Sequence, residues 1–211
     1  DIATDEASGI TQIAQPKGPI LALAPATNPT STAIFKTLIC LKTRNPLIVS
    51  PHRGARKCVK ETLRILAEAA ERAGAPAGSI QVMTRSQTEY VDRVMRHPDL
   101  ALILATGTSS IVGLAQKSGT PTLGVGPGNV PVFVHATADL PYAARCIVHS
   151  KTFDNGTVCA SEQALVVEHD VADRLRPLFE ARHTYFCTRA ESEALGPVCF
   201  DMDNMRMRPE A

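Results

Sequence analysis

The segment Leu100-Ala-Leu-Ile-Leu-Ala-Thr-Gly-Thr-Ser-Ser110 decides the fold class. It opens with an uninterrupted apolar run, which is typical of a strand buried on both faces of a parallel sheet. The Thr, Gly and Ser residues that follow end the strand and begin a helical pattern that stops near Gly119. A buried strand that passes through a short polar turn into a helix is the repeating unit of α/β proteins.

The same strand–helix unit recurs along residues 20–125. Buried strands are predicted at residues 20–23, 47–49, 79–83, 100–105 and 121–125. A long helix is predicted from about Gly54 to Ala73, and the capping box Ser86-Gln-Thr-Glu89 predicts the start of another. These repeats indicate right-handed crossovers and a Rossmann-like, mostly parallel sheet with helices on both faces.

Ligands of such sheets bind beyond the carboxyl ends of the strands. The loops at residues 26–32, 50–56 and 106–110 are therefore candidate sites. In residues 105–110, free backbone N–H groups and a helix dipole favour an anion such as a pyrophosphate. An ordinary capped helix start explains the same residues equally well.

The pattern changes after Val125. The run Gly124-Val-Gly-Pro-Gly128 is followed by an apolar stretch at residues 130–134 and not by a helix. We therefore interpret it as a tight turn between two strands and not as a dinucleotide fingerprint, which needs a helix next. A domain boundary is predicted near Asn129, and Asp139 is predicted to cap a helix.

Composition narrows the class of protein. The chain has 211 residues, is 44% hydrophobic and 20% charged, and carries 22 basic against 21 acidic side chains. This balance argues against nucleic-acid binding through bulk charge, and a Trp-free chain with 4% aromatic residues lacks stacking platforms. With no apolar run of bilayer length and an acidic start, neither a membrane span nor a secretory signal is expected. We expect a cytoplasmic protein that acts on a small molecule.

The six cysteines show no CxxC pair and no zinc-finger spacing, so neither a metal site nor a disulfide framework is predicted. We expect reduced, mostly buried thiols, one of which is a candidate nucleophile. They are Cys40, Cys58, Cys146, Cys159, Cys187 and Cys199.

Five segments carry a family resemblance, at residues 27–36, 50–52, 104–107, 124–131 and 150–163. The first reads Thr27-Asn-Pro-Thr-Ser-Thr-Ala-Ile-Phe-Lys36, and the last reads Ser150-Lys-Thr-Phe-Asp-Asn-Gly-Thr-Val-Cys-Ala-Ser-Glu-Gln163. In this order they resemble the CoA-acylating branch of the aldehyde dehydrogenase superfamily. The resemblance implies a dinucleotide-binding domain over residues 1–128, and over residues 129–211 the first part of an α/β catalytic domain that carries the nucleophilic cysteine.

The resemblance also implies a two-step reaction. A cysteine thiolate attacks an aldehyde, and hydride passes from the thiohemiacetal to NAD or NADP. The thiol of coenzyme A then attacks the resulting thioester and leaves as acyl-CoA. The family also runs this reaction backward from acyl-CoA, and its members form homo-oligomers.

Residue by residue, Cys159 matches the family nucleophile, although a structural thiol is its alternative. Asn28 matches the oxyanion-hole amide, which would act with the backbone N–H of Cys159, or it merely caps its helix. Four residues match the segment that approaches the cofactor. They are Thr106, Gly107, Thr108 and Ser109.

Ser50, Pro51 and His52 match the segment that meets the adenine ribose. Arg53 stands where the family pattern leads us to expect Pro, and its guanidinium would pair a 2′-phosphate, which favours NADP. Gly124 stands where hydrolytic aldehyde dehydrogenases place a water-activating Glu, and its lack of a side chain preserves the thioester for coenzyme A. Glu162 is an alternative base.

Two other functions stay open. One is a hydrolytic aldehyde dehydrogenase that releases the free acid, and the other is a non-catalytic nucleotide-binding fragment. The family resemblance implies a chain much longer than 211 residues, so we expect a partial enzyme that ends shortly after its nucleophile. The pattern weakens beyond His183, and residues 197–211 are expected to be loosely structured.

Overall fold

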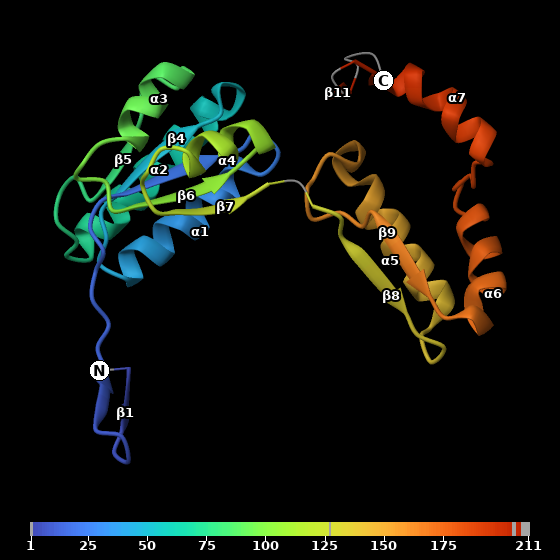
Figure 1. Cartoon of the computed structure of the whole chain (residues 1–211), viewed down its shortest axis with the longest axis horizontal. Helices are drawn as coiled ribbons and strands as arrows, with labels where there is room; N and C mark the ends of the chain where they lie inside the picture. Colours follow the sequence, from blue (N-terminus) through green and yellow to red (C-terminus); the bar gives the residue numbers. More distant parts are fainter. Residues whose placement is uncertain (1, 127, 204–205, 208–211) are drawn as a thin grey trace. The chain divides into compact units, whose positions relative to one another are not determined.

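The structure is a computed structural model that describes residues 2–126, 128–203 and 206–207. The chain divides into two compact units, Asp1–Gly128 and Asn129–Ala211 (Figure 1). That the first binds a dinucleotide and the second begins a catalytic domain stays a prediction.

Five parallel strands form the sheet of the first unit in the order β5-β4-β3-β6-β7. In sequence order the strands are β3 (Ile20–Ala24), β4 (Leu47–Pro51), β5 (Ile80–Val82), β6 (Leu102–Thr106) and β7 (Thr122–Val125). Every residue of the central strand β3 is buried, as expected for a strand covered on both faces. The predicted parallel α/β fold is confirmed.

Helices cover both faces of this sheet (Figure 1). They are α1 (Pro29–Lys42), α2 (Arg56–Arg72), α3 (Thr88–Met95) and α4 (Ser109–Gln116), with the 3₁₀ turn η1 (Arg53–Ala55) before α2. Val59 and Leu63 of α2 pack in one core with Ala22 and Val49. The helices α3 and α4 pack in a second core that contains Leu21. Alternate residues of the sheet therefore enter opposite cores.

The predicted capping box at the start of α3 is wrong. Gln87 is the N-cap residue of α3, and no side chain caps the helix there. The Ser86 hydroxyl instead accepts a hydrogen bond of 2.9 Å from Nη2 of Arg56. The capping box depends on the Ser86 hydroxyl, and Arg56, which is distant in sequence, binds that hydroxyl instead.

The second unit contains two parallel strands, β8 (Pro131–Val134) and β9 (Ala164–Val167). Two helices, α5 (Leu140–Thr152) and α6 (His169–Glu180), pack with them around a core that includes Val134, Leu140, Val171, Leu175 and Phe179. The Asp139 carboxylate accepts a hydrogen bond of 3.0 Å from the backbone N–H of Tyr142, which confirms the predicted cap. A 3₁₀ turn, η2 (Phe153–Gly156), follows α5.

Three further features were not predicted. The helix α7 (Arg189–Cys199) begins with a capping box between Thr188 and Glu191, so loose structure was a wrong expectation for residues 197–199. This Thr-x-x-Glu pattern is readable in the sequence. Near the start of the chain, β1 (Ala3–Asp5) and β2 (Ile10–Gln12) form an antiparallel hairpin, and β10 (Phe200–Asp201) pairs with β11 (Arg206–Met207).

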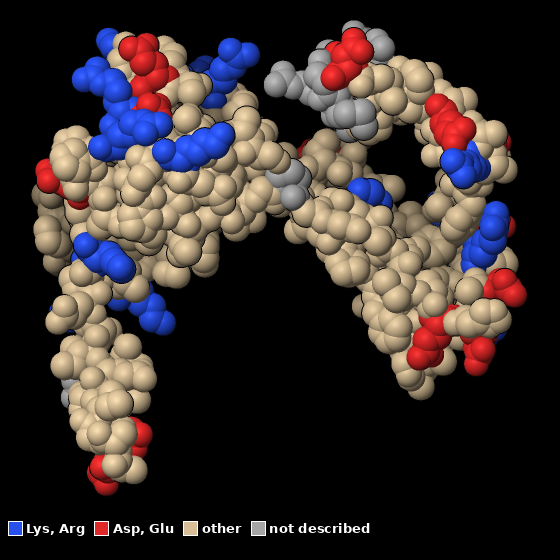
Figure 2. All heavy atoms as spheres, viewed as in Figure 1, with Lys and Arg blue, Asp and Glu red and all other residues tan. Residues whose placement is uncertain are grey.

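The glycine-rich run at residues 124–129 joins β7 to β8, which belong to different sheets. Pro127, on which the predicted tight turn rests, lies outside the described residues. Among the helices that the structure describes, none is long and apolar enough to cross a membrane. Lys and Arg side chains occur together with Asp and Glu on each unit (Figure 2), in keeping with a net charge of +1.

Candidate active site

The strand order of the first unit places a topological switch point between the neighbouring strands β3 and β6. The chain leaves β3 toward β4 on one side and leaves β6 toward β7 on the other. Ligands of open α/β sheets bind at the carboxyl edge beside this point. The last residues of β4 and β6, together with the segments that follow β3, β4 and β6, lie at that edge, and they carry most of the predicted site residues.

Asn28 follows β3 and is the half-buried N-cap residue of α1. Its side chain does not cap the helix. Its Oδ1 accepts a hydrogen bond of 3.2 Å from the Thr27 hydroxyl. The alternative interpretation of Asn28 as a simple capping side chain is therefore wrong, and its amide nitrogen has no protein acceptor among the described residues.

The strand β4 ends with buried Ser50 and Pro51, and exposed His52 and Arg53 follow it. The backbone N–H of His52 donates to the Ala24 carbonyl over 2.9 Å, which ties this loop to the end of β3. Nδ1 of His52 accepts a bond of 3.2 Å from Gly54. The imidazole is thus fixed by its own turn, while no ion pair of Arg53 is found within the described part of the chain.

The loop after β6 leads into α4 with Thr108 as the N-cap residue. The Thr108 hydroxyl bonds to the Ser110 hydroxyl over 2.9 Å and not to a helix N–H. The first-turn N–H groups of α4, including that of Ser109, therefore lack a side-chain cap. Such a helix start can bind an anion.

Gly107 has a packing role that the sequence did not reveal. A Cβ at Gly107 would lie 2.8 Å from Cγ2 of Ile111, so a larger residue would push the loop off α4. Its backbone N–H donates to the Val125 carbonyl over 3.2 Å. Close packing thus requires the glycine whether or not a cofactor approaches it.

Gly124 pairs with Ala105 in the sheet and lies under α4. A Cβ at this position would lie 2.6 Å from Cγ1 of Val112, a buried side chain of that helix. Real Cβ atoms essentially never approach this closely, so a side chain here would force Val112 to shift. The glycine is therefore a structural requirement of this sheet edge.

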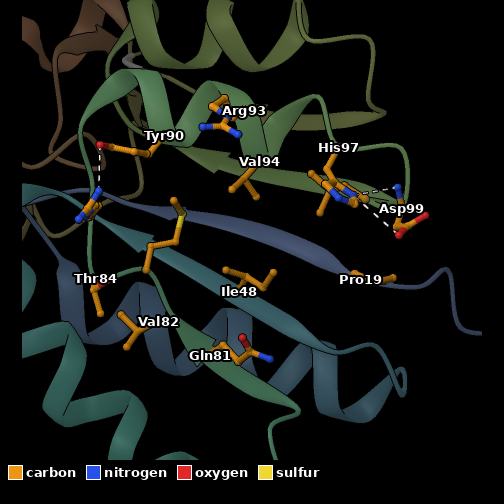
Figure 3. Close-up of a pocket in the computed structure, with 13 residues that line it drawn as sticks. Pro19, Ile48, Gln81, Val82, Thr84, Tyr90, Arg93, Val94, His97 and Asp99 are labelled. Atoms are coloured by element: carbon orange, nitrogen blue, oxygen red, sulfur yellow. Dashed lines mark hydrogen bonds and ion pairs between the residues drawn. The ribbon is translucent and has the colours of Figure 1, made fainter.

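One cavity of about 730 Å³ lies elsewhere in the first unit (Figure 3). Ile48 and Val82 line it from the sheet, and Tyr90 and Val94 line it from α3. Arg85 donates a hydrogen bond of 3.0 Å to the Tyr90 hydroxyl beside it. None of the predicted cofactor residues lines this cavity, so it is not the predicted site.

Cys159 belongs to the second unit, in the loop between η2 and β9, and is half-buried. All six cysteines are free thiols, but Cys58, Cys146 and Cys187 are exposed, so the expectation of mostly buried thiols is wrong. No cluster of metal-ligating side chains is found among the residues described. One carboxylate oxygen of Glu162 is buried without a hydrogen-bond partner in the described structure.

The profile of the aldehyde dehydrogenase family matches residues 2–202. The chain belongs to the aldehyde dehydrogenase family. An aldehyde-alcohol dehydrogenase of Streptococcus pneumoniae is 45% identical over 199 residues, which are 94% of this chain and 22% of that protein. The chain therefore spans less than a quarter of this relative's length.

Two solved structures of the family are similar. A probable aldehyde dehydrogenase of Listeria monocytogenes shares 45% identity with a TM-score of 0.87, over 99% of this chain and 46% of that one. A propionaldehyde dehydrogenase of Rhodopseudomonas palustris, solved with bound CoA and an acylated cysteine, shares 28% identity with a TM-score of 0.77, over 90% and 43%. The resemblance to the CoA-acylating branch of the aldehyde dehydrogenases is confirmed.

The predicted site residues therefore fall in two parts of the chain. Asn28, His52 and Thr106 lie at the carboxyl edge of the sheet in the first unit, whereas Cys159 belongs to the second unit. The roles of all these residues, and the pairing of Asn28 with the Cys159 N–H in one oxyanion site, stay predictions.

Proposed function

We propose that the chain supplies the cofactor site and the nucleophile of a CoA-acylating aldehyde dehydrogenase that uses NAD or NADP. The observation that carries this proposal is the 2.6 Å approach that a Cβ at Gly124 would make to Val112. The position that holds the water-activating Glu in hydrolytic relatives cannot take a side chain unless Val112 is displaced. We therefore expect coenzyme A, and not water, to be the acyl acceptor, with Glu162 as the alternative base.

Cys159 is the proposed nucleophile. Its thiolate attacks the aldehyde carbon, and the carbonyl electrons move to the oxygen, which becomes an oxyanion. The Asn28 amide and the Cys159 backbone N–H donate hydrogen bonds to that oxygen. After oxidation the thioester carbon is attacked by the CoA thiol, and Cys159 leaves as the thiolate.

The residues at the carboxyl edge fit a dinucleotide. The uncapped start of α4 offers N–H groups to a pyrophosphate. Arg53 follows the second strand of the sheet, where Rossmann folds distinguish a ribose from its 2′-phosphate. When bound, the nicotinamide accepts the hydride of the substrate. Thr106 and Gly107 would border the nicotinamide, and Ser50, Pro51 and His52 would border the adenine ribose.

The experiment that tests this proposal compares turnover with and without coenzyme A. Purified protein is mixed with a short aldehyde and NAD or NADP, and the reduced nicotinamide, the acyl-CoA and the free acid are measured. We expect sustained turnover only with coenzyme A, and none in the Cys159→Ala variant.

The contrary outcomes identify the alternatives. Equal turnover without coenzyme A, with free acid as product, would make the protein hydrolytic, with Glu162 as the remaining candidate base. A thermal shift on NAD or NADP binding without turnover under either condition would make it a nucleotide-binding protein.

We also propose that the enzyme is cytoplasmic and forms a homo-oligomer. Six free thiols suit the reducing cytoplasm. Phe35 and Leu38 on α1 are 61% and 56% exposed, as expected of side chains that a homo-oligomer would bury. Light scattering of the purified protein tests the assembly, and a monomer would exclude it.

A further inference from the structure

Two consecutive turns hold the Cys159 loop, and they share one design. The first spans Asp154 to Thr157 and is closed by a hydrogen bond of 3.1 Å from the Thr157 N–H to the Asp154 carbonyl. The second spans Val158 to Ser161 and is closed by a bond of 3.0 Å from the Ser161 N–H to the Val158 carbonyl. Cys159 is the second residue of the second turn.

In each turn a hydroxyl doubles the closing bond. The Thr157 hydroxyl lies 2.7 Å from the Asp154 carbonyl oxygen and 2.8 Å from its carboxylate. The Ser161 hydroxyl donates to the Val158 carbonyl over 2.8 Å. A hydroxyl that returns to the carbonyl three residues before it adds a restraint that the backbone alone lacks.

The first turn is strained and needs that restraint. Asp154 and Asn155 have φ of 50° and 53°, and Gly156 has φ of 70°, so three successive residues are left-handed. Each L-residue in this conformation costs about 1–2 kcal/mol. A Cβ on Gly156 would also lie 3.1 Å from the Lys151 carbonyl oxygen, so the turn packs closely against the end of α5.

The second turn is anchored through buried Ser161. Ser161 is 3% exposed, and Nζ of Lys151 lies 3.5 Å from its hydroxyl. In a turn of this kind the N–H of the second residue is not used in closure, so the Cys159 N–H is left for a ligand. The orientation of that N–H follows from how firmly Val158 and Ser161 are held together.

We propose that Thr157 and Ser161 are positioning residues, whose hydroxyls lock the two turns that orient Cys159 and its backbone N–H. The inference rests on the proposed function of Cys159 as nucleophile. Neither hydroxyl touches the substrate in this scheme, and both act through the backbone. The Asn155-Gly156 pair supplies the positive φ angles, and the hydroxyls keep the strained form populated.

The test measures the reactivity of Cys159 itself and needs no substrate. The protein is alkylated with iodoacetamide, and labelling of each cysteine is followed by mass spectrometry of its peptides. Thr157→Val removes the first hydroxyl while it keeps the branched shape, Ser161→Ala removes the second, and Thr157→Ser retains a hydroxyl. Exposed Cys146, in the same unit, and Cys58 are internal references.

We expect Cys159 to label about tenfold more slowly in Thr157→Val and Ser161→Ala, the effect of losing one net hydrogen bond. Thr157→Ser should restore the rate, and Cys58 and Cys146 should label as before. The exposed Ser192→Ala, on α7, is a control for loss of a hydroxyl elsewhere.

Unchanged or faster labelling of Cys159 in both variants would overturn the proposal. A parallel change at all cysteines, with a lower urea midpoint, would also overturn it, because it would mean general loosening. The experiments distinguish failure of the proposed function from failure of the positioning roles. Retained CoA-dependent turnover in Cys159→Ala would refute the proposed function. An inactive Cys159→Ala, together with normal labelling in the turn variants, would refute only the positioning roles.

Discussion

The ammonium nitrogen of Lys36 donates a hydrogen bond of 2.7 Å to the carbonyl oxygen of Leu23. A second bond of 2.8 Å reaches the carbonyl of Leu104. Leu23 lies on β3 and Leu104 on β6, so one side chain from α1 joins the two strands beside the switch point. Lys36 is only 4% exposed, and burial lowers its pKa to about 8.

Lys36 should make the free energy of unfolding rise with pH above about 8. The folded protein loses this proton near pH 8, whereas the unfolded chain keeps it to about 10.5, so the unfolded state binds more protons between these values. Burial raises the pKa of Cys40 from 9.0 to about 11, and that stabilisation is fully present below pH 9 and is lost through pH 11. The window from pH 8 to 9 therefore isolates Lys36.

Urea unfolding across this window tests the assignment. The rise should be absent in Lys36→Met, which has no group to titrate. An identical slope in the variant and the parent protein would show that Lys36 does not titrate there.

Gly124→Ala should lower the free energy of unfolding by about 1–3 kcal/mol, because the new Cβ must displace Val112 in a packed core. Gly113→Ala is the control. Gly113 lies on α4, the helix that carries Val112, and a Cβ there meets nothing within 4 Å. Its helical position predicts a gain of about 0.5–1 kcal/mol. Urea midpoints of the two variants that fall equally would contradict this account of Gly124.

Asn28→Ala should slow turnover by about 10²–10³-fold through loss of an oxyanion donor, with little change in stability because its side chain caps nothing. Asn45→Ala is the contrasting control. Asn45 is 7% exposed, and its Oδ1 accepts bonds of 2.6 and 2.9 Å from Lys17 and Gly18. It should lower stability and leave the specific rate of the folded enzyme intact. Comparable kcat in Asn28→Ala and the parent would remove Asn28 from the site.

Arg53→Ala should raise KM for NADP by about tenfold and leave KM for NAD unchanged, because only NADP carries the 2′-phosphate that a guanidinium pairs. Steady-state kinetics with each cofactor measures the ratio. The neighbouring exposed cation in Lys57→Ala controls for general loss of charge. A parent enzyme that prefers NAD, or uses both cofactors equally, would refute the role of Arg53.

The parallel sheet was predictable because its strands are short apolar runs that end near Gly, Pro or Thr. A strand that is apolar on both faces is stable where helices cover both faces of the sheet, as in a parallel α/β fold. The position of Cys159 in a polar loop was also predictable. Its two turns were missed, although Asn155-Gly156 is the pair that turns with two positive φ angles favour. The Thr188 capping box was missed in the same way, while the similar motif at Ser86 was overridden by Arg56.

The sequence alone determined the strand–helix order, the family, and the residue types available for chemistry, because periodicity and local motifs depend on neighbours along the chain. Only the tertiary structure decided why Gly107 and Gly124 must be glycine, that Asn28 does not cap α1, and that Lys36 joins β3 to β6. Gly124 and Lys36 depend on atoms that folding brings from another element, whereas Asn28 and Gly107 depend on the local geometry of a loop that the sequence pattern did not fix. Steric contact and hydrogen bonding act over a few ångströms in space, whatever the separation in sequence.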